Sequence, residues 1–142
     1  MAIEWSQKLA VGVEAIDAQH RELFKQVNQL IAAMEARHGE AEVTRIVQFL
    51  GDYVIRHFGD EERLMARTGY PDAAAHEKLH EAFVADFVKL KAELARTGAS
   101  PALATQLNQK VGGWLIDHIG RTDRALGAFL AGKAAATAPR AG

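Results

Sequence analysis

Two short patterns in the chain pair histidine with a second metal-binding side chain. His57 is followed four residues later by Glu61, and His76 is followed four residues later by His80. Residues four apart on a helix lie on the same face, so each pair can direct both side chains at one ion. Either pair alone is a weak signal, but together they indicate a metal site on at least two helices.

The remaining histidines strengthen this interpretation. His20 and His118 fall on the inward side of other helical segments, whereas His38 stands beside Gly39 and is expected at the surface. Each buried imidazole needs a polar partner, and five of them in one small core are costly unless they bind a metal. We therefore interpret five histidines as metal ligands: His20, His57, His76, His80 and His118.

The types and the number of the ligands narrow the choice of metal and indicate how many ions are bound. The chain contains no cysteine, and imidazole with carboxylate suits iron, manganese or zinc. Five imidazoles and two carboxylates oversupply one six-coordinate ion, while two octahedral ions need about twelve positions. If both carboxylates bridge and a solvent oxygen is shared, roughly one position stays open for a small ligand.

The identity of the two carboxylates is less constrained by spacing. Asp60 and Glu61 follow His57 by three and four residues, so helical geometry permits either one as a ligand. Asp123 lies five residues after His118, about 140° away on a regular helix. Those two can converge only if the helix bulges or ends between them, and Gly120 offers the place.

Four amphipathic segments can position these side chains. Alanine is abundant, prolines number three, and long stretches of alternating polarity are missing, which favours helix over strand. We expect helices over 17–38, 42–66, 72–96 and 101–120, with Asp17 and Ser100 as N-caps. Leu79 and Ile116 are expected to face inward with the other apolar residues.

These segments predict an all-α fold, an up-down-up-down antiparallel four-helix bundle. Residues 1–16 form an N-terminal arm that docks through Ile3 and Trp5, and residues 121–130 form a short C-terminal helix. One domain spans residues 1–131, and residues 132–142 are expected to be disordered because they carry nothing large to bury.

Composition excludes several classes of protein. The 142 residues are 49% hydrophobic, and 17 basic side chains against 18 acidic ones give a net charge of −1. This balance argues against a nucleic-acid partner. No apolar run suggests membrane insertion and the first residues do not resemble a signal peptide, so we expect a cytoplasmic monomer.

The motifs resemble those of the hemerythrin family, in particular the single-domain bacterial hemerythrins. The resemblance spans about residues 3 to 130 and includes the Trp5 arm, residues 16–20 (IDAQH), His57-Phe58, Tyr70-Pro71, the His76/His80 pair, and residues 114–123. All seven ligand positions of the family pattern carry the expected residue type.

The resemblance implies a four-helix bundle holding two iron ions, a di-iron centre with a bridging oxo or hydroxo group. His76, His80 and His118 would hold one iron, while His20 and His57 would hold the iron with the open position. Glu61 and Asp123 would bridge the two. The family pattern also implies an apolar oxygen pocket lined by Leu23, Phe58, Trp114 and Ile119.

The implied function is reversible binding of dioxygen, for storage, transport or delivery, without catalysis. Two alternatives use the same site. One is a di-iron redox enzyme with peroxidase-like or nitric-oxide-handling activity, and the other is an oxygen sensor module. The ligand set favours the carrier, because it is rich in histidine and has few anionic donors.

Overall fold

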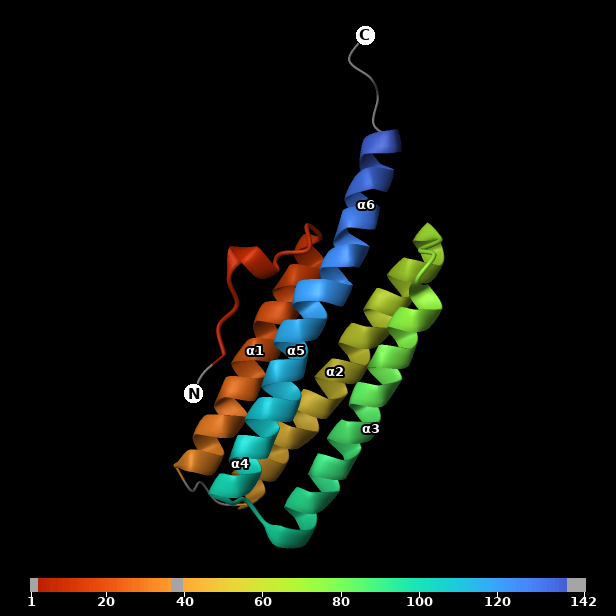
Figure 1. The fold of residues 1–142 in the computed structure, drawn as a ribbon. Helices are drawn as coiled ribbons and strands as arrows, with labels where there is room; N and C mark the ends of the chain where they lie inside the picture. The colour runs from red at the N-terminus through yellow and green to blue at the C-terminus, as the bar shows by residue number, and fades with distance from the viewer. Residues whose placement is uncertain (1–2, 37–39, 138–142) are drawn as a thin grey trace.

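The computed structural model describes residues 3–36 and 40–137, and every regular element within these ranges is a helix. Three long helices come first: α1 (Glu14–Glu35), α2 (Glu40–Thr68) and α3 (Ala73–Thr97). A fourth rod of shorter helices returns along α1, and neighbouring rods run in opposite directions (Figure 1). The predicted all-α antiparallel four-helix bundle is confirmed, while His38 and Gly39 lie outside the described residues.

The fourth rod changes its helical type along its length. Its segments are α4 (Pro101–Leu107), η2 (Asn108–Gly113), α5 (Trp114–His118), η3 (Ile119–Asp123) and α6 (Arg124–Thr137), of which η2 and η3 are π-helical. As predicted, Ser100 caps the start: its hydroxyl accepts a hydrogen bond from the Leu103 amide at 3.1 Å. The two π turns shift the face that this rod presents to the bundle.

The C-terminal helix is longer than expected. α6 continues beyond the other rods to Thr137 (Figure 1). The disorder expected from residue 132 is therefore wrong for residues 132–137. Alanine-rich sequence sustains a helix without burying large side chains, and the Lys133 ammonium donates to the Thr68 carbonyl at 2.7 Å. Residues 138–142 lie outside the described part of the chain.

The N-terminal arm is fixed by a side chain that we expected to cap a helix. α1 begins at Glu14, so Asp17 lies inside its first turn rather than at its N-cap. The Asp17 carboxylate instead accepts hydrogen bonds from the backbone amides of Val11, at 2.8 Å, and Gly12, at 3.3 Å. The arm then passes so close to α6 that a Cβ at Gly127 would overlap the Val11 carbonyl.

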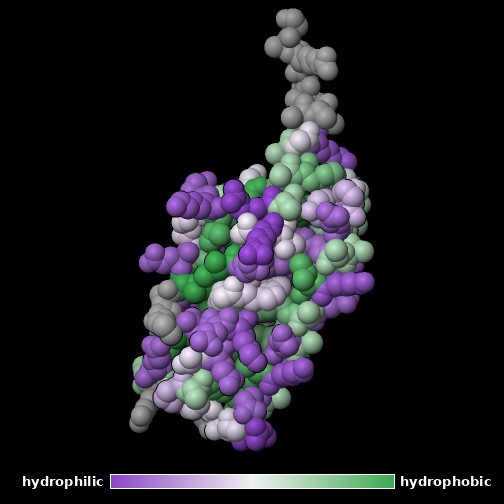
Figure 2. All heavy atoms as spheres, in the orientation of Figure 1, coloured by the Kyte–Doolittle hydropathy of each residue, from purple (hydrophilic) through white to green (hydrophobic). Residues whose placement is uncertain are grey.

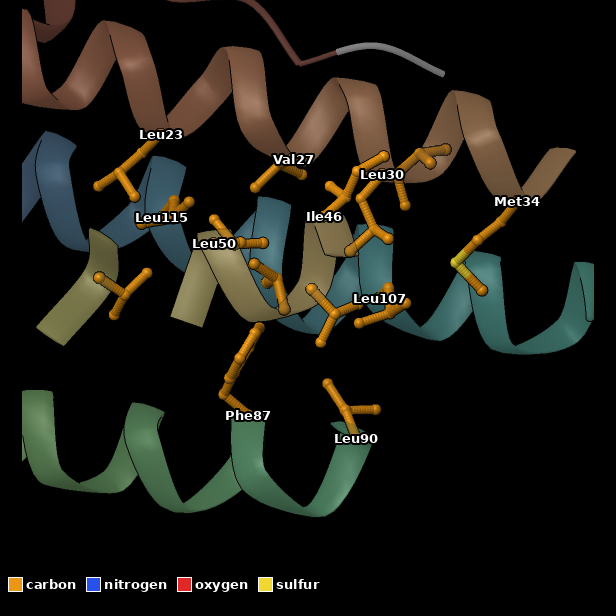
Figure 3. Close-up of a cluster of buried hydrophobic side chains, with 14 of the residues drawn as sticks. Leu23, Val27, Leu30, Met34, Ile46, Leu50, Phe87, Leu90, Leu107 and Leu115 are labelled. Carbon is orange, nitrogen blue, oxygen red and sulfur yellow. The ribbon is translucent and has the colours of Figure 1, made fainter. Parts of the chain in front are cut away.

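The main apolar core fills the part of the bundle away from α6. Leucines dominate it, as Figure 3 shows for Leu23 and Leu30 of α1 and Leu50 of α2. A smaller apolar cluster, made of Met65, Tyr70 and Leu126, lies toward the other end.

Two residues expected in the core are exposed instead. Leu79 is 43% exposed and Ile116 is 40% exposed. On α3 the inward face begins with His76 and His80, which leaves no inward place for Leu79. On the fourth rod Leu115 and His118 face inward, so Ile116 turns toward solvent.

The surface carries polar and apolar side chains interspersed on the face seen in Figure 2. Within residues 3–36 and 40–137, no helix combines the length and the apolar character needed to cross a membrane.

Candidate metal centre

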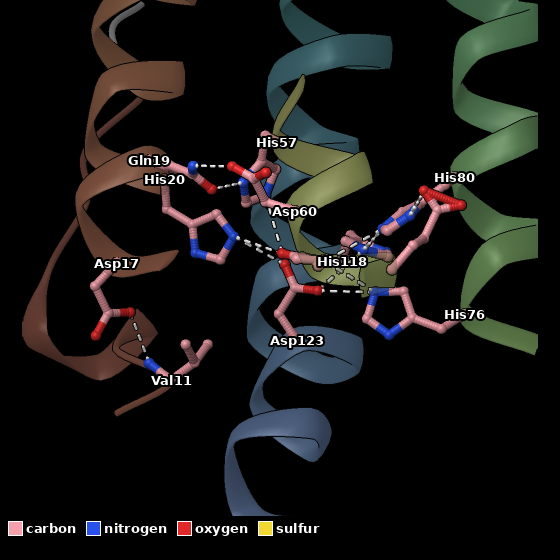
Figure 4. A network of polar contacts seen from close by, with 12 residues as sticks. Val11, Asp17, Gln19, His20, His57, Asp60, His76, His80, His118 and Asp123 are labelled. Atoms are coloured by element: carbon pink, nitrogen blue, oxygen red, sulfur yellow. Dashed lines mark hydrogen bonds and ion pairs between the residues drawn. The ribbon is translucent and has the colours of Figure 1, made fainter. Parts of the chain in front are cut away.

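All seven predicted ligand residues meet in one buried layer of the bundle. Figure 4 shows most of them converging from the four rods. α1 contributes His20, α2 contributes His57 and Glu61, α3 contributes His76 and His80, α5 contributes His118, and η3 contributes Asp123. None is more than 4% exposed.

On one side of this layer, two histidines face one oxygen from each carboxylate. The His57 Nε2 lies 2.9 Å from Glu61 Oε2, and the His20 Nε2 lies 3.0 Å from Asp123 Oδ2. The His20 nitrogen is also 3.3 Å from Glu61 Oε2. We call His20, His57 and these two oxygens the four-donor set.

On the other side, three histidines face the second oxygen of each carboxylate. The His76 Nε2 lies 3.0 Å from Asp123 Oδ1 and 3.1 Å from Glu61 Oε1. The His80 and His118 nitrogens lie 3.3 Å and 3.2 Å from Glu61 Oε1 and Asp123 Oδ1, respectively. These three histidines and two oxygens form the five-donor set, so both carboxylates lie between the two sets.

The spacing of these atoms fits metal ions. A metal that holds its ligands at about 2.1 Å places adjacent octahedral ligands about 3.0 Å apart. Both Asp123 oxygens are buried and face imidazole nitrogens at 3.0–3.2 Å, but none of these contacts has the geometry of a hydrogen bond. The Nε2 atoms of His80 and His118 face each other at 3.2 Å, where two lone pairs would repel unless a cation or a proton lies between them. The donor chemistry and geometry therefore fit a metal centre.

The π-helical segment η3 is what brings His118 and Asp123 together. A regular α-helix places side chains five residues apart on different faces, whereas the wider i→i+5 turn of a π-helix brings them closer to one face. The predicted bulge is present over Ile119–Asp123. Gly120 lies inside it, although a Cβ there would make only an ordinary 3.7 Å contact with Leu9.

Glu61, not Asp60, points into the layer. The Asp60 carboxylate accepts hydrogen bonds from the Gln19 amide, at 2.7 Å, and from Arg63. Gln19 is a residue that we did not predict at the site, and its Oε1 lies 2.7 Å from the Nδ1 of His57. Its position directly before His20 was the available signal in the sequence.

Without metal, several side chains in this layer have pKa values far from their ordinary ones. Burial alone would lower the pKa of His20, but its contacts with Asp123 and Glu61 raise that pKa to about 9. The pKa of His76 rises to about 9 for the same reason. Burial opposes ionisation of Glu61 and Asp123, yet their histidine contacts hold both carboxyl pKa values below the ordinary range. Burial lowers the pKa of His80.

Aromatic rings pack against the five-donor set. Phe58 stacks on His80 with ring centroids 3.8 Å apart, and Trp114 stacks on His118 at 4.3 Å. Leu23 and Ile119 are fully buried. Of the four residues predicted to line an oxygen pocket, Leu23, Phe58 and Ile119 are therefore in the core, and the partly buried Trp114 packs against it.

Comparison with known proteins agrees with this geometry. Residues 11–130 match the family model described as "Hemerythrin HHE cation binding domain". A bacteriohemerythrin of Stenotrophomonas maltophilia is 32% identical over 121 residues, which cover 85% of this chain and 76% of that protein. A myohemerythrin of Riftia pachyptila is 33% identical over 115 residues, covering 81% and 82%.

A solved structure shares the fold as well as the sequence. The crystal structure of a wild-type hemerythrin aligns with a TM-score of 0.81 and 29% identity, over 90% of this chain and 97% of that one. Family match, sequence relatives and architecture lead to one conclusion: this chain belongs to the hemerythrin family.

Proposed function

We propose that this chain binds dioxygen reversibly at a non-haem di-iron centre and so stores, transports or delivers oxygen. The observation that carries the proposal is the division of the Glu61 and Asp123 oxygens between two sets of histidines. Related proteins named bacteriohemerythrin and myohemerythrin support it. The proposed ligands are His20, His57, Glu61, His76, His80, His118 and Asp123.

The donor count points to the place where oxygen binds. With one shared oxo or hydroxo group, the five-donor set completes about six positions and the four-donor set about five. We therefore place the open position on the side of His20 and His57. Two iron ions held by these residues would supply the electrons that dioxygen takes on binding and returns on release.

The surroundings favour binding over catalysis. Among the described residues, the buried side chains with a carboxyl, amide or basic group outside the candidate ligands are Asp17 and Gln26. Asp17 holds the arm, and the Gln26 amide donates to Glu22 at 2.9 Å. A redox enzyme needs an acid or base at the reacting centre, and neither of these side chains is available for that role.

The apolar residues near the site support reversibility. We propose that Leu23, Phe58, Trp114 and Ile119 exclude water and protons from bound oxygen. Leu23 and Ile119 expose none of their surface, and the Phe58 ring reaches the four-donor set, with its centroid 5.9 Å from that of His57. The Trp114 ring stacks on His118 of the five-donor set. Dry surroundings suppress proton-driven loss of reduced oxygen species.

Optical titration tests the function. The anaerobic ferrous protein should develop a charge-transfer band as oxygen is added, and the band should vanish under vacuum over repeated cycles. One-way oxidation with release of hydrogen peroxide would favour the redox enzyme instead. The expected monomeric state and cytoplasmic location stay predictions.

A further inference from the structure

We infer that Gln19 is a positioning residue that fixes the tautomer of His57 and connects this imidazole to a surface ion pair. The inference rests on the proposed di-iron function and concerns the side with the open position. It is carried by a chain of contacts from His57 through Gln19 and Asp60 to Arg63.

The direction of each hydrogen bond follows from the chemistry of the partners. A carboxylate only accepts, so the Gln19 atom 2.7 Å from Asp60 Oδ2 must be the amide nitrogen. The Gln19 oxygen then faces His57 and can only accept from its Nδ1, at 2.7 Å. His57 must therefore carry its proton on Nδ1, which leaves the Nε2 lone pair directed into the site.

Three of the other buried histidines have no comparable partner at Nδ1. The Nδ1 atoms of His20, His76 and His80 are buried without a hydrogen-bond partner, and the nearest carboxylate oxygen to His80 Nδ1, on Glu62, is 3.8 Å away. Of the two histidines in the four-donor set, His57 alone has this fixed orientation.

The chain of contacts crosses from the interior to the surface. The side chain of His57 is 2% exposed, that of Asp60 is 32% exposed, and that of Arg63 is 69% exposed. Gln19, Asp60 and Arg63 also line one surface groove. The negative charge of Asp60 is thus separated from the imidazole by a neutral amide.

That separation has a predicted electronic effect. A carboxylate bonded directly to a ligand histidine raises the basicity of the imidazole and stabilises the more oxidised metal. A neutral amide donates less electron density, which keeps the ferrous state accessible. Gln19 should therefore favour release of oxygen over irreversible oxidation.

The decisive variant moves the negative charge from position 60 to position 19, directly beside the His57 imidazole. Gln19→Glu combined with Asp60→Asn exchanges the amide and the carboxylate, so the net charge and the number of hydrogen-bonding groups are kept. We expect a lower midpoint potential than in the wild-type protein, with two irons still bound. Asp60→Asn alone keeps an acceptor for Gln19 and should shift the potential less.

Gln19→Leu tests the positioning role without adding charge. It should weaken iron affinity about 10–100-fold and abolish one slowly exchanging imidazole N–H signal in the NMR spectrum of the ferrous protein. Gln29→Leu, at an exposed position of the same helix, is the matched control and should change neither quantity.

An unchanged midpoint potential in the exchanged variant, or an unchanged N–H signal in Gln19→Leu, would overturn the inference. Both readouts are made without oxygen. A wild-type protein that fails to bind oxygen reversibly would therefore contradict the proposed function and leave these measurements to decide the role of Gln19.

Discussion

The two halves of the bundle are stabilised in different ways. Around Leu30 and Leu50 the four rods meet mainly through apolar side chains (Figure 3). Around Glu61 and Asp123 they meet through seven buried polar side chains (Figure 4), several of which carry a buried nitrogen or oxygen that has no hydrogen-bond partner. Apolar packing needs nothing beyond the chain, whereas unsatisfied buried polar groups cost free energy until a ligand satisfies them.

This difference implies that the two halves of the same helices have different roles. The apolar half supplies stability that does not depend on metal, and the metal half stays assembled because the apolar half holds its rods in place. Changes in the metal half should therefore act first on metal content, and changes in the apolar half first on the free energy of unfolding.

The largest effect is expected from Glu61→Ala. Its two oxygens face both sets of histidines, so the change removes a donor from each and should abolish stoichiometric binding of both irons. Iron analysis and absorbance spectroscopy measure this loss.

Asp60→Asn, which keeps an acceptor for Gln19, is the control for Glu61→Ala. The two carboxylates are adjacent, but Asp60 faces Gln19 and Arg63, so the control should keep about two irons per chain. Equal iron loss in the two variants would show that adjacent charge, not ligation by Glu61, holds the metal.

Leu23→Ala and Leu30→Ala compare the two halves on one helix. Both leucines are buried, so each truncation should cost about 2–5 kcal/mol of unfolding free energy. Leu23 lies one turn from His20, so its variant should also autoxidise faster because water enters near the site, while iron content is retained. Denaturant unfolding and the decay of the oxygenated band measure the two effects.

Leu30→Ala should destabilise the protein with no change in autoxidation, because its cavity opens in the apolar half. If Leu23→Ala also leaves the autoxidation rate unchanged, Leu23 is ordinary core and the oxygen pocket lies elsewhere.

The pH dependence of the unfolding free energy should distinguish the metal-free protein from the iron-loaded protein. The folded-state pKa values of His20 and His76, about 9, exceed the ordinary value of 6.5. Their stabilising contribution is therefore complete below pH 6.5 and is lost as the pH rises through about 9. Metal-free protein should lose stability over this window, measured by urea unfolding at several pH values.

Iron-loaded protein should not lose stability over the same window, because the metal replaces the protons on both imidazoles. Iron loading at neutral pH should accordingly release about two protons per chain, measured in a weakly buffered solution. A flat stability profile in the metal-free protein would contradict the assigned protonation of His20 and His76.

Much of this architecture could be predicted because the apolar residues and the metal-binding residues follow the same helical spacing. On α2, Val54, Phe58 and Met65 share the inward face with His57 and Glu61, so one helical period placed both the core and the ligands. The five-residue step from His118 to Asp123 predicted that the helix bulges or ends between them, and the structure has a π-helical bulge there.

The errors arose where tertiary contacts override the local pattern. Asp17 is a favourable cap by type, but the arm supplied better-placed amides for its carboxylate. Ile116 lies between two π segments that change the inward face. The contacts of Gln19 cross between α1 and α2 and have no periodic signature.

The smallest effect is expected from Leu79→Ala, although Leu79 is the neighbour of a candidate ligand. The inward face of α3 is formed by His76, His80 and Phe83, and Leu79 is 43% exposed beside it. Its truncation should change the unfolding free energy by no more than about 0.5 kcal/mol and leave iron content and autoxidation unchanged. Leu90→Ala on the same helix, at a residue only 6% exposed, should cost about 2–5 kcal/mol. Because Leu79 also borders the surface groove next to His76, faster autoxidation in Leu79→Ala would show that this groove, rather than the Leu23 side, admits water to the metal.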